Sequence, residues 1–130
     1  MDGSFDTLGG MSRRIKLALA AILVALTATV AGCSASSVDT SHATIIDVRT
    51  PAEYAQGHLR GAVNIDVQAT TFASQIAALP QDGTYLLYCR SGARAGQAKT
   101  IMNQAGFTDV TNLGSLQAAS SSTGLPIVTT

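Results

Sequence analysis

Hydrophobic residues along this chain form one long run and, after it, several short runs separated by polar turns. The long run extends from Leu17 to Val30, and the short runs begin at Thr44. The short runs have the β-branched or continuous apolar character of buried strands. We therefore predict strands at Thr44–Val48, Ala62–Ile65 and Tyr85–Tyr88, and a last strand that contains Val110 and Leu113.

Helix signals lie between the predicted strands. Thr50 and Glu53 have the spacing of a capping box, with Pro51 at the first helical position, and Gly57 is placed to end that helix. Apolar residues at helical spacing predict two more helices, one with Phe72, Ile76 and Leu79 and one with Ala95, Ala98, Ile101, Met102 and Ala105. Alternating strands and helices predict an α/β fold with a small parallel sheet, in which ligand sites lie at the carboxyl ends of the strands.

Residues 1–33 have the three parts of a secretory signal peptide. A basic segment precedes the long apolar run, and small residues after the run lead to Cys33. The run has about 15 residues and would span roughly 22 Å as a helix, so a permanent transmembrane span is the weaker alternative. Residues 1–10 have no pattern of their own, which would fit a true start at Met11.

Val30-Ala-Gly-Cys33 resembles a bacterial lipobox, in which the cysteine is acylated and becomes the new N-terminus after cleavage. We expect lipidation of Cys33 to anchor the exported protein to a membrane, facing outward or into the periplasm, without embedding it. Residues 34–43 are small and polar and are predicted to form a flexible tether. Residues 44–130 then form one small domain.

Charge excludes several kinds of partner. The chain has 8 Lys+Arg against 8 Asp+Glu, so it offers neither a basic surface for nucleic acid nor a polybasic patch for lipids. Its His, Cys and Asp residues do not have metal-ligand spacing, and it has no glycine-rich nucleotide motif. We therefore expect no nucleic-acid partner, no metal and no cofactor.

Cys89 directly follows a predicted strand and begins the loop Cys89-Arg90-Ser91-Gly92-Ala93-Arg94. A loop between a strand and a helix N-terminus directs successive N–H groups toward one point. Gly92 gives the backbone freedom for such a turn, and the small Ser91 and Ala93 leave its mouth open. With Arg90 and Arg94 nearby, we predict a thiolate nucleophile at Cys89 and an anionic substrate on residues 90–94. The alternative is an inert buried thiol.

Three residues elsewhere are candidates for supporting roles. Asp47 closes a strand before a capped helix, where an aspartate more often binds backbone N–H groups than acts as an acid or base. Arg49 is either an edge of the anion site or an ion-pair partner. His58 is either a base for Cys89 or a packing residue. If Cys89 is already an ionised thiolate, its reaction requires no base.

The candidate residues occur within five segments: Asp47-Val-Arg49, Pro51-Ala-Glu53-Tyr54, Gly57-His58-Leu-Arg-Gly61-Ala62-Val-Asn64-Ile65, Cys89 to Arg94, and Ala105-Gly106-Phe107 with Val110-Thr-Asn112-Leu113. Together they resemble a single-domain rhodanese. The resemblance implies a parallel sheet with helices on both faces. It also implies a thiosulfate sulfurtransferase in which Cys89 takes a sulfane sulfur from an anionic donor, holds it as a persulfide and passes it to a thiol or cyanide.

Other functions use a similar loop. Protein tyrosine phosphatases and related arsenate reductases have Cys-x5-Arg, which encloses a tetrahedral oxyanion, whereas Cys89 and Arg94 have four residues between them. The narrower ring suits a single sulfur atom better. A non-enzymatic persulfide carrier or thiol sensor would also fit the loop, although a sensor would more naturally have a second, resolving cysteine.

Overall fold

The computed structural model describes residues 37–130, which form six strands and four helices. In chain order they are β1 Ala43–Asp47, α2 Pro51–Gln56, β2 His58–Leu59, β3 Val63–Asn64, α3 Phe72–Ala77, β4 Thr84–Cys89, α4 Ala93–Gln104, β5 Asp109–Ser115, α5 Leu116–Thr123 and β6 Ile127–Val128. The predicted signal peptide and lipobox lie outside the described residues. Within the described part, none of the helices combines the length and apolar character needed to cross a membrane.

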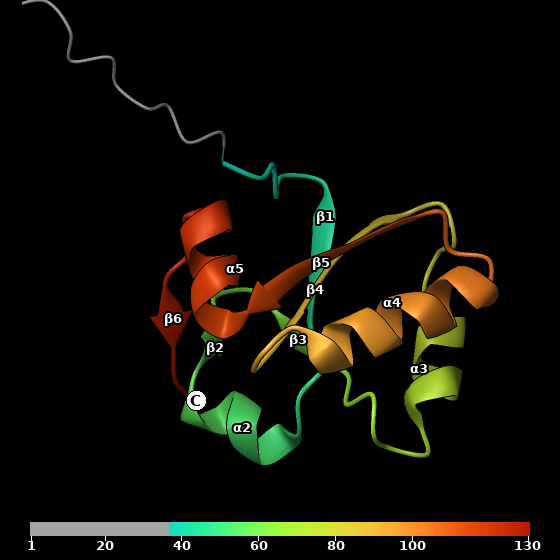
Figure 1. Ribbon diagram of the computed structural model, residues 1–130, viewed down its shortest axis with the longest axis horizontal. Coiled ribbons are helices and arrows are strands. Elements are labelled where there is room, and N and C mark those ends of the chain that lie inside the picture. Colours follow the sequence, from blue (N-terminus) through green and yellow to red (C-terminus); the bar gives the residue numbers. More distant parts are fainter. Residues whose placement is uncertain (1–36) are drawn as a thin grey trace, which may run out of the picture. The chain divides into compact units, whose positions relative to one another are not determined.

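The main sheet has four parallel strands in the order β3-β1-β4-β5, with β1 and β4 in the middle (Figure 1). Parallel strands end at the same edge, so Asp47 at the end of β1 pairs in register with Tyr88, the neighbour of Cys89. The register between β4 and β5 shifts after Leu87, and Cys89 lies opposite Ser115. The predicted α/β fold with a parallel sheet is confirmed.

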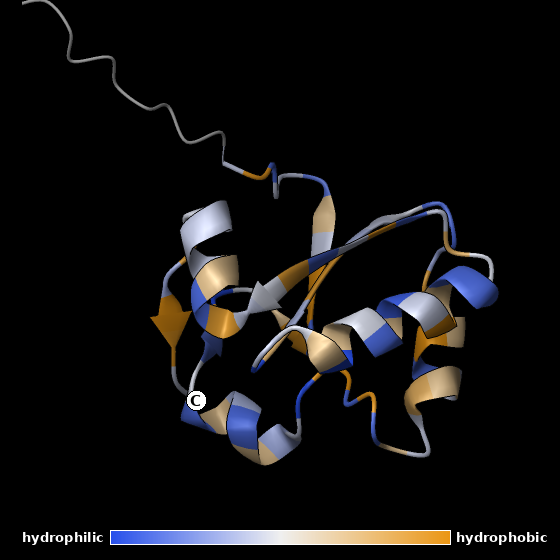
Figure 2. Cartoon of the chain, viewed as in Figure 1, coloured by the Kyte–Doolittle hydropathy of each residue, from blue (hydrophilic) through white to orange (hydrophobic). Residues whose placement is uncertain are grey.

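Alternating strand residues build a separate core on each face of the sheet. Ile46, Leu87 and Cys89 belong to the core that α3 and α4 cover. Ile45 and Leu86 belong to the core that α5 covers, with α2 at its edge. Figure 1 shows α3 and α4 on one side of the sheet and α2 and α5 on the other, and Figure 2 shows hydrophobic residues concentrated along the strands between them. Helices therefore cover both faces, as the resemblance implies.

The first helix begins as the capping-box spacing predicts. Thr50 Oγ1 accepts a hydrogen bond from Glu53 N at 3.3 Å, and Glu53 Oε2 accepts one from Thr50 N at 3.1 Å. Pro51 occupies the first turn, and Gly57 ends the helix. Because these bonds fix the start of α2, they also fix the direction of the Glu53 carboxylate.

A short antiparallel ladder between β2 and β6 is not predicted by the sequence pattern. His58 pairs with Val128 and Leu59 pairs with Ile127, and Arg60 N donates to Pro126 O at 3.0 Å. Strands of two residues are too short to show a periodicity. The ladder joins the middle of the domain to the segment that follows α5.

Ordered contacts also begin before residue 44. Val38, which lies in the predicted tether, donates its N–H to Ser122 O at 2.7 Å and packs its side chain against the core that α5 covers. One apolar residue within a polar segment gives little sequence signal, although the partly buried Val38 contacts the domain through both its side chain and its backbone N–H.

Candidate active site

The candidate nucleophile Cys89 is the last residue of β4, and its side chain is fully buried. It faces the core that α3 and α4 cover, with Leu87 and Ala95 among its buried neighbours in that cluster. The amide N of Gly92 donates to Cys89 Sγ at 3.0 Å. The Gly92 N–H is therefore directed at the sulfur, and the thiolate that the sequence predicts at Cys89 stays a prediction.

Gly92 shapes the loop around Cys89. It has φ 96°, in the left-handed region, and it is the residue before the first turn of α4. A Cβ at this position would lie 3.2 Å from Gly114 Cα. Asn112 Nδ2 donates to Gly92 O at 3.0 Å, and Asn112 Oδ1 accepts from Gly114 N at 2.8 Å. The end of β5 therefore supports the loop from one side.

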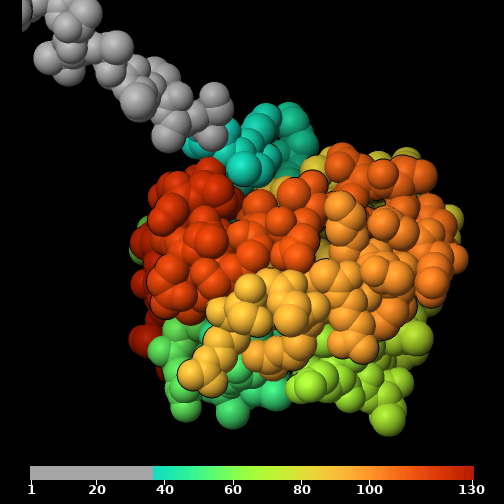
Figure 3. All heavy atoms as spheres, viewed as in Figure 1, coloured from blue at the N-terminus to red at the C-terminus, as the bar shows by residue number. Residues whose placement is uncertain are grey.

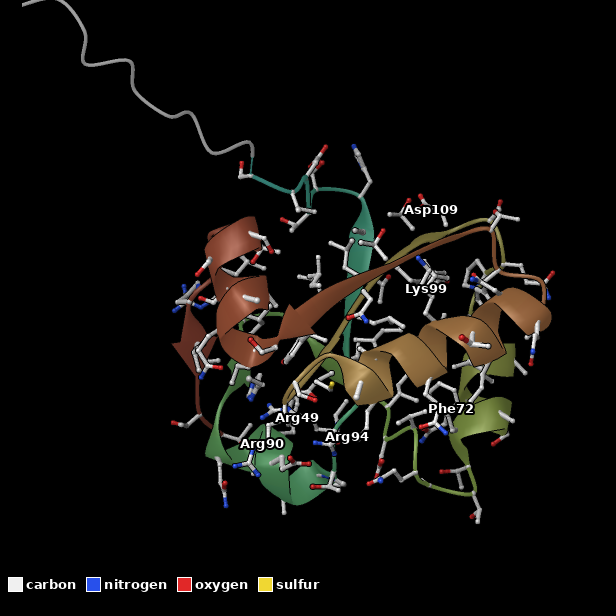
Figure 4. The ribbon with its side chains drawn as sticks, in the orientation of Figure 1. Arg49, Phe72, Arg90, Arg94, Lys99 and Asp109 are labelled. Atoms are coloured by element: carbon white, nitrogen blue, oxygen red, sulfur yellow. The ribbon has the colours of Figure 1, made fainter. Side chains whose placement is uncertain are left out.

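Arg90, Ser91 and Ala93 are exposed at the mouth of the loop, and Ser91 Oγ accepts from Ala93 N at 3.4 Å. Figure 4 shows Arg49, Arg90 and Arg94 together beside the carboxyl end of β4, away from Lys99. The predicted loop residues therefore lie between the end of β4 and the first turn of α4, and their proposed contacts with a substrate stay predictions.

Arg94 is held by a carboxylate on another element. Its Nη1 and Nη2 donate to the two carboxylate oxygens of Glu53, both at 2.8 Å. Figure 3 shows the start of α4 against α2, where this pair lies. The hydrogen bonds from Arg94 lower the pKa of Glu53 to about 2. Both ends of the guanidinium are therefore engaged, and a substrate anion would have to compete with Glu53 for Arg94.

Asp47 and Arg49 form a second pair, buried at the end of β1. Arg49 Nη2 donates to Asp47 Oδ2 at 2.6 Å and to Gly57 O at 2.6 Å, and Arg49 N donates to Asp47 Oδ1 at 2.9 Å. The hydrogen bonds with Asp47 raise the pKa of Arg49. The guanidinium also lies over the ring of Tyr88, 5.7 Å from its centroid. Asp47 thus accepts from the backbone, as predicted, and from Arg49 as well.

His58 interacts with Tyr54. The two rings stack with centroids 3.7 Å apart, and His58 Nδ1 lies 2.9 Å from Tyr54 O. The Tyr54 hydroxyl donates to Ala62 O at 2.7 Å. These contacts give His58 a place in the packing between α2 and β2.

An open hollow of about 430 Å³ lies beside the loop. Arg90 forms part of its wall. The other lining residues are Arg49, which follows β1, Glu53 and Gln56 of α2, and Leu116 and Gln117 of α5. No sequence pattern predicts a site role for Glu53, Gln56, Asn112, Leu116 or Gln117. Glu53 carried a capping signal only. Neither an exposed glutamine nor a buried leucine at a helix end has a sequence pattern that would mark it as part of a site.

Comparisons with known proteins agree on one family. A model of the rhodanese-like domain matches residues 33–121. Thiosulfate sulfurtransferase PspE of Escherichia coli (strain K12) is 39% identical over 72 residues, 55% of this chain and 69% of that protein. A sulfurtransferase of Allochromatium vinosum is 38% identical over 90 residues, 69% of this chain and 82% of that protein. The solved structure of a rhodanese with anions from E. coli matches with a TM-score of 0.58 at 34% identity, over 68% of this chain and 99% of that chain.

Proposed function

This chain belongs to the rhodanese-like domain family, and from that membership and its sulfurtransferase relatives we propose a specific reaction. The protein moves a sulfane sulfur from a small anionic donor such as thiosulfate to a thiol or cyanide, through a persulfide on Cys89. The observation that carries this proposal is the position of Cys89 Sγ. It lies at the end of a central strand, under the N–H of Gly92 at 3.0 Å, in the loop that leads into α4.

The first half-reaction loads the sulfur. The Cys89 thiolate attacks the outer sulfur of thiosulfate and forms a new S–S bond. The S–S bond of thiosulfate breaks, and its electron pair leaves with sulfite. Arg90 and the loop N–H groups would stabilise the negative charge that collects on the leaving group, since preorganised donors act most strongly where charge develops.

The second half-reaction returns the enzyme to its starting form. An acceptor thiolate, or cyanide, attacks the outer sulfur of the persulfide and takes it. The bond between Sγ and the outer sulfur breaks, and the electron pair returns to Cys89. Both reactants enter as anions, so the cycle balances without a general base, in agreement with the packing role of His58.

Mass spectrometry of the purified protein after incubation with thiosulfate tests the proposal. We expect the mass to increase by one sulfur atom, which cyanide removes as thiocyanate. Cys89→Ser should gain no sulfur, because an alcohol is a poor nucleophile toward sulfane sulfur. Cys33→Ser is the matched control, because it removes the other of the chain's two cysteines, and it should load like the wild type. A loaded Cys89→Ser, or an unloaded wild type, would reject the proposal.

We also propose that Cys33 anchors the exported protein through an attached lipid. A Cys33→Ser variant should then be uncleaved at this position and should leave the membrane fraction with a changed mobility on a gel. Identical fractionation and mobility of variant and wild type would overturn the lipid anchor and leave the sulfur chemistry untouched.

A further inference from the structure

The sulfur of Cys89 is closed off from solvent in this structure. Cys89 is 0% exposed, its Sγ accepts the N–H of Gly92 at 3.0 Å, and it does not line the hollow beside the loop. In the proposed reaction, thiosulfate has to bring its outer sulfur into bonding contact with Sγ. The residues that cover Sγ must therefore move before sulfur is loaded, and the structure shows the loop at residues 90–94 in its closed form.

Contacts on two sides hold the loop in this closed form. On the side of β5, Asn112 Nδ2 donates to Gly92 O at 3.0 Å. On the side of α2, the guanidinium of Arg94 donates to both carboxylate oxygens of Glu53, each at 2.8 Å. Arg94 lies in the first turn of α4, so its pair with Glu53 joins the exit of the loop to α2.

The Glu53 carboxylate is held in place independently of Arg94. Its Oε2 accepts from Thr50 N at 3.1 Å and from Thr50 Oγ1 at 3.0 Å, as part of the capping box of α2. A side chain that is already fixed loses little conformational entropy when it pairs. Glu53 therefore presents Arg94 with a fixed partner, and opening the loop breaks this pair.

We propose that Glu53 is a positioning residue that acts through Arg94, favours the closed loop and so controls how often Cys89 becomes accessible. This inference deepens the proposed function, and its role in sulfur transfer rests on that function. A dianionic donor that pairs with Arg94 in place of Glu53 favours the open loop. Because a ligand shifts a conformational equilibrium only by binding one state better than the other, the charge of the donor is what admits it to Cys89.

Alkylation by iodoacetamide measures how often Cys89 is accessible. The reagent is uncharged, so a change of charge in the protein does not alter its approach. The thiolate displaces iodide and forms a thioether, which mass spectrometry follows on the peptide of the full chain that contains Cys89. At low reagent concentration the rate is proportional to the open fraction. Its pH midpoint reports how readily the thiol ionises, and its plateau at high pH reports access.

The plateaus should rank as the contacts of the loop predict. The wild type should lie about a hundredfold below a free thiol such as N-acetylcysteine, because the ion pair and the two hydrogen bonds at Gly92 contribute a factor of roughly five each. Glu53→Gln should raise the plateau about fivefold, since a glutamine still serves the capping box but cannot form the ion pair. Arg94→Gln should raise it equally, and the double variant no further, because all three lack the same pair.

Two control variants separate opening of the loop from other causes. Asp109→Asn removes one carboxylate at the start of β5 and should leave the plateau unchanged. Gly61→Ala strains the backbone at φ 83°, in the turn between β2 and β3, and lowers the global stability without a contact to the loop. It should also keep the wild-type plateau, because opening of the loop is local and does not require unfolding of the domain.

The outcomes distinguish this inference from the function that it deepens. An unchanged plateau in Glu53→Gln, or a shift of the pH midpoint alone, would overturn the role of Glu53. An equal rise in Gly61→Ala would also overturn it, because global unfolding would then expose Cys89. A wild-type plateau equal to that of the free thiol would mean that the loop does not close over the sulfur. A protein that shows the expected plateaus but gains no sulfur from thiosulfate contradicts the proposed function alone.

Discussion

The face of the sheet under α3 and α4 has an apolar core, whereas the face toward α2 and α5 also contains buried polar groups. The buried polar or charged residues of the described part of the chain are Asp47, Arg49, His58 and Thr123. Asp47 ends β1 and Arg49 follows it, His58 lies in β2, and Thr123 lies in α5. Each is satisfied by a hydrogen bond. The apolar face therefore depends on volume, and the polar face depends on the pairing of particular atoms.

This difference predicts how each face responds to substitution. A core of packed apolar side chains loses stability in proportion to the space that a substitution leaves. A buried ion pair loses most when a single partner is removed, because the remaining charge stays buried without compensation. The site has the nucleophile Cys89 on the first face and the buried Asp47–Arg49 pair on the second, so substitutions on either face can affect it.

The largest loss of stability is expected from Asp47→Ala. Asp47 is 0% exposed. Its removal leaves the buried Arg49 guanidinium with Gly57 O as its remaining acceptor among residues 37–130. We expect the free energy of unfolding to fall by about 3 to 5 kcal/mol, measured by chemical denaturation. The double variant Asp47→Leu/Arg49→Met should lose less than Asp47→Ala alone. A loss below about 1 kcal/mol in Asp47→Ala would mean that the pair is solvated and would break the comparison.

Leu87→Ala tests the apolar face. Leu87 is 0% exposed in the middle of β4, so truncation should cost about 2 to 5 kcal/mol through lost burial and the cavity left behind. Leu86, on the opposite face of the same strand, is 3% exposed, and Leu86→Ala should cost a similar amount. The denaturation midpoints of the two variants compare the faces directly. If either variant were as stable as the wild type, its face would not be closely packed.

Gly92→Ala should destabilise the protein by about 1 to 3 kcal/mol. Its φ of 96° is unfavourable for any other residue, and the new Cβ would also meet Gly114 Cα at 3.2 Å. Gly61→Ala is the matched control, since Gly61 has φ 83° and open space around its would-be Cβ. The control should show the backbone strain alone, and the difference between the two thermal midpoints measures the contact with Gly114. Equal losses would show that the loop moves away from β5 without cost.

The smallest effect is expected from Glu53→Gln, and it should depend on pH. Pairing with Arg94 lowers the pKa of Glu53 from 4.5 to about 2, so the folded state binds this proton less readily than the unfolded state. The stabilisation is therefore complete above pH 4.5 and is lost as the pH falls through about 2. The side chains of Arg94 and Glu53 are 21% and 26% exposed, so screening limits the effect to about 1 kcal/mol.

Denaturation of Glu53→Gln and wild type across this pH range provides the measurement. Their difference in stability should be largest near neutral pH and should shrink toward pH 2. A difference that stays constant with pH would show that the carboxylate charge of Glu53 does not contribute.

The elements that the sequence predicted correctly are those with local signals. The capping bonds of Thr50 and Glu53 join residues three apart, and the β-branched run that predicts β1 lies within the strand itself. The position of Cys89 follows in the same way, from an apolar strand before it and a helix after it.

Contacts between distant residues lack such signals. Glu53 and Arg94 are 41 positions apart, and the pairing is decided by where α2 and α4 meet. The sequence placed Arg94 in an anion site without the carboxylate that neutralises it. The hollow was missed for the same reason, because Gln56 and Gln117 come together only after α2 and α5 are in place.

The ladder between β2 and β6 has a consequence for the time course of folding. It joins His58 to Val128, and all the elements from β3 to α5 lie between these two residues along the chain. Bringing the ends of so long a segment together costs chain entropy before any contact repays it, so contacts of this kind form late. We therefore expect the four-stranded sheet to assemble first and β6 to dock last. By the same logic β6 should be the first strand to detach, and amide hydrogen exchange should show its protection lost at lower free energy than that of β4.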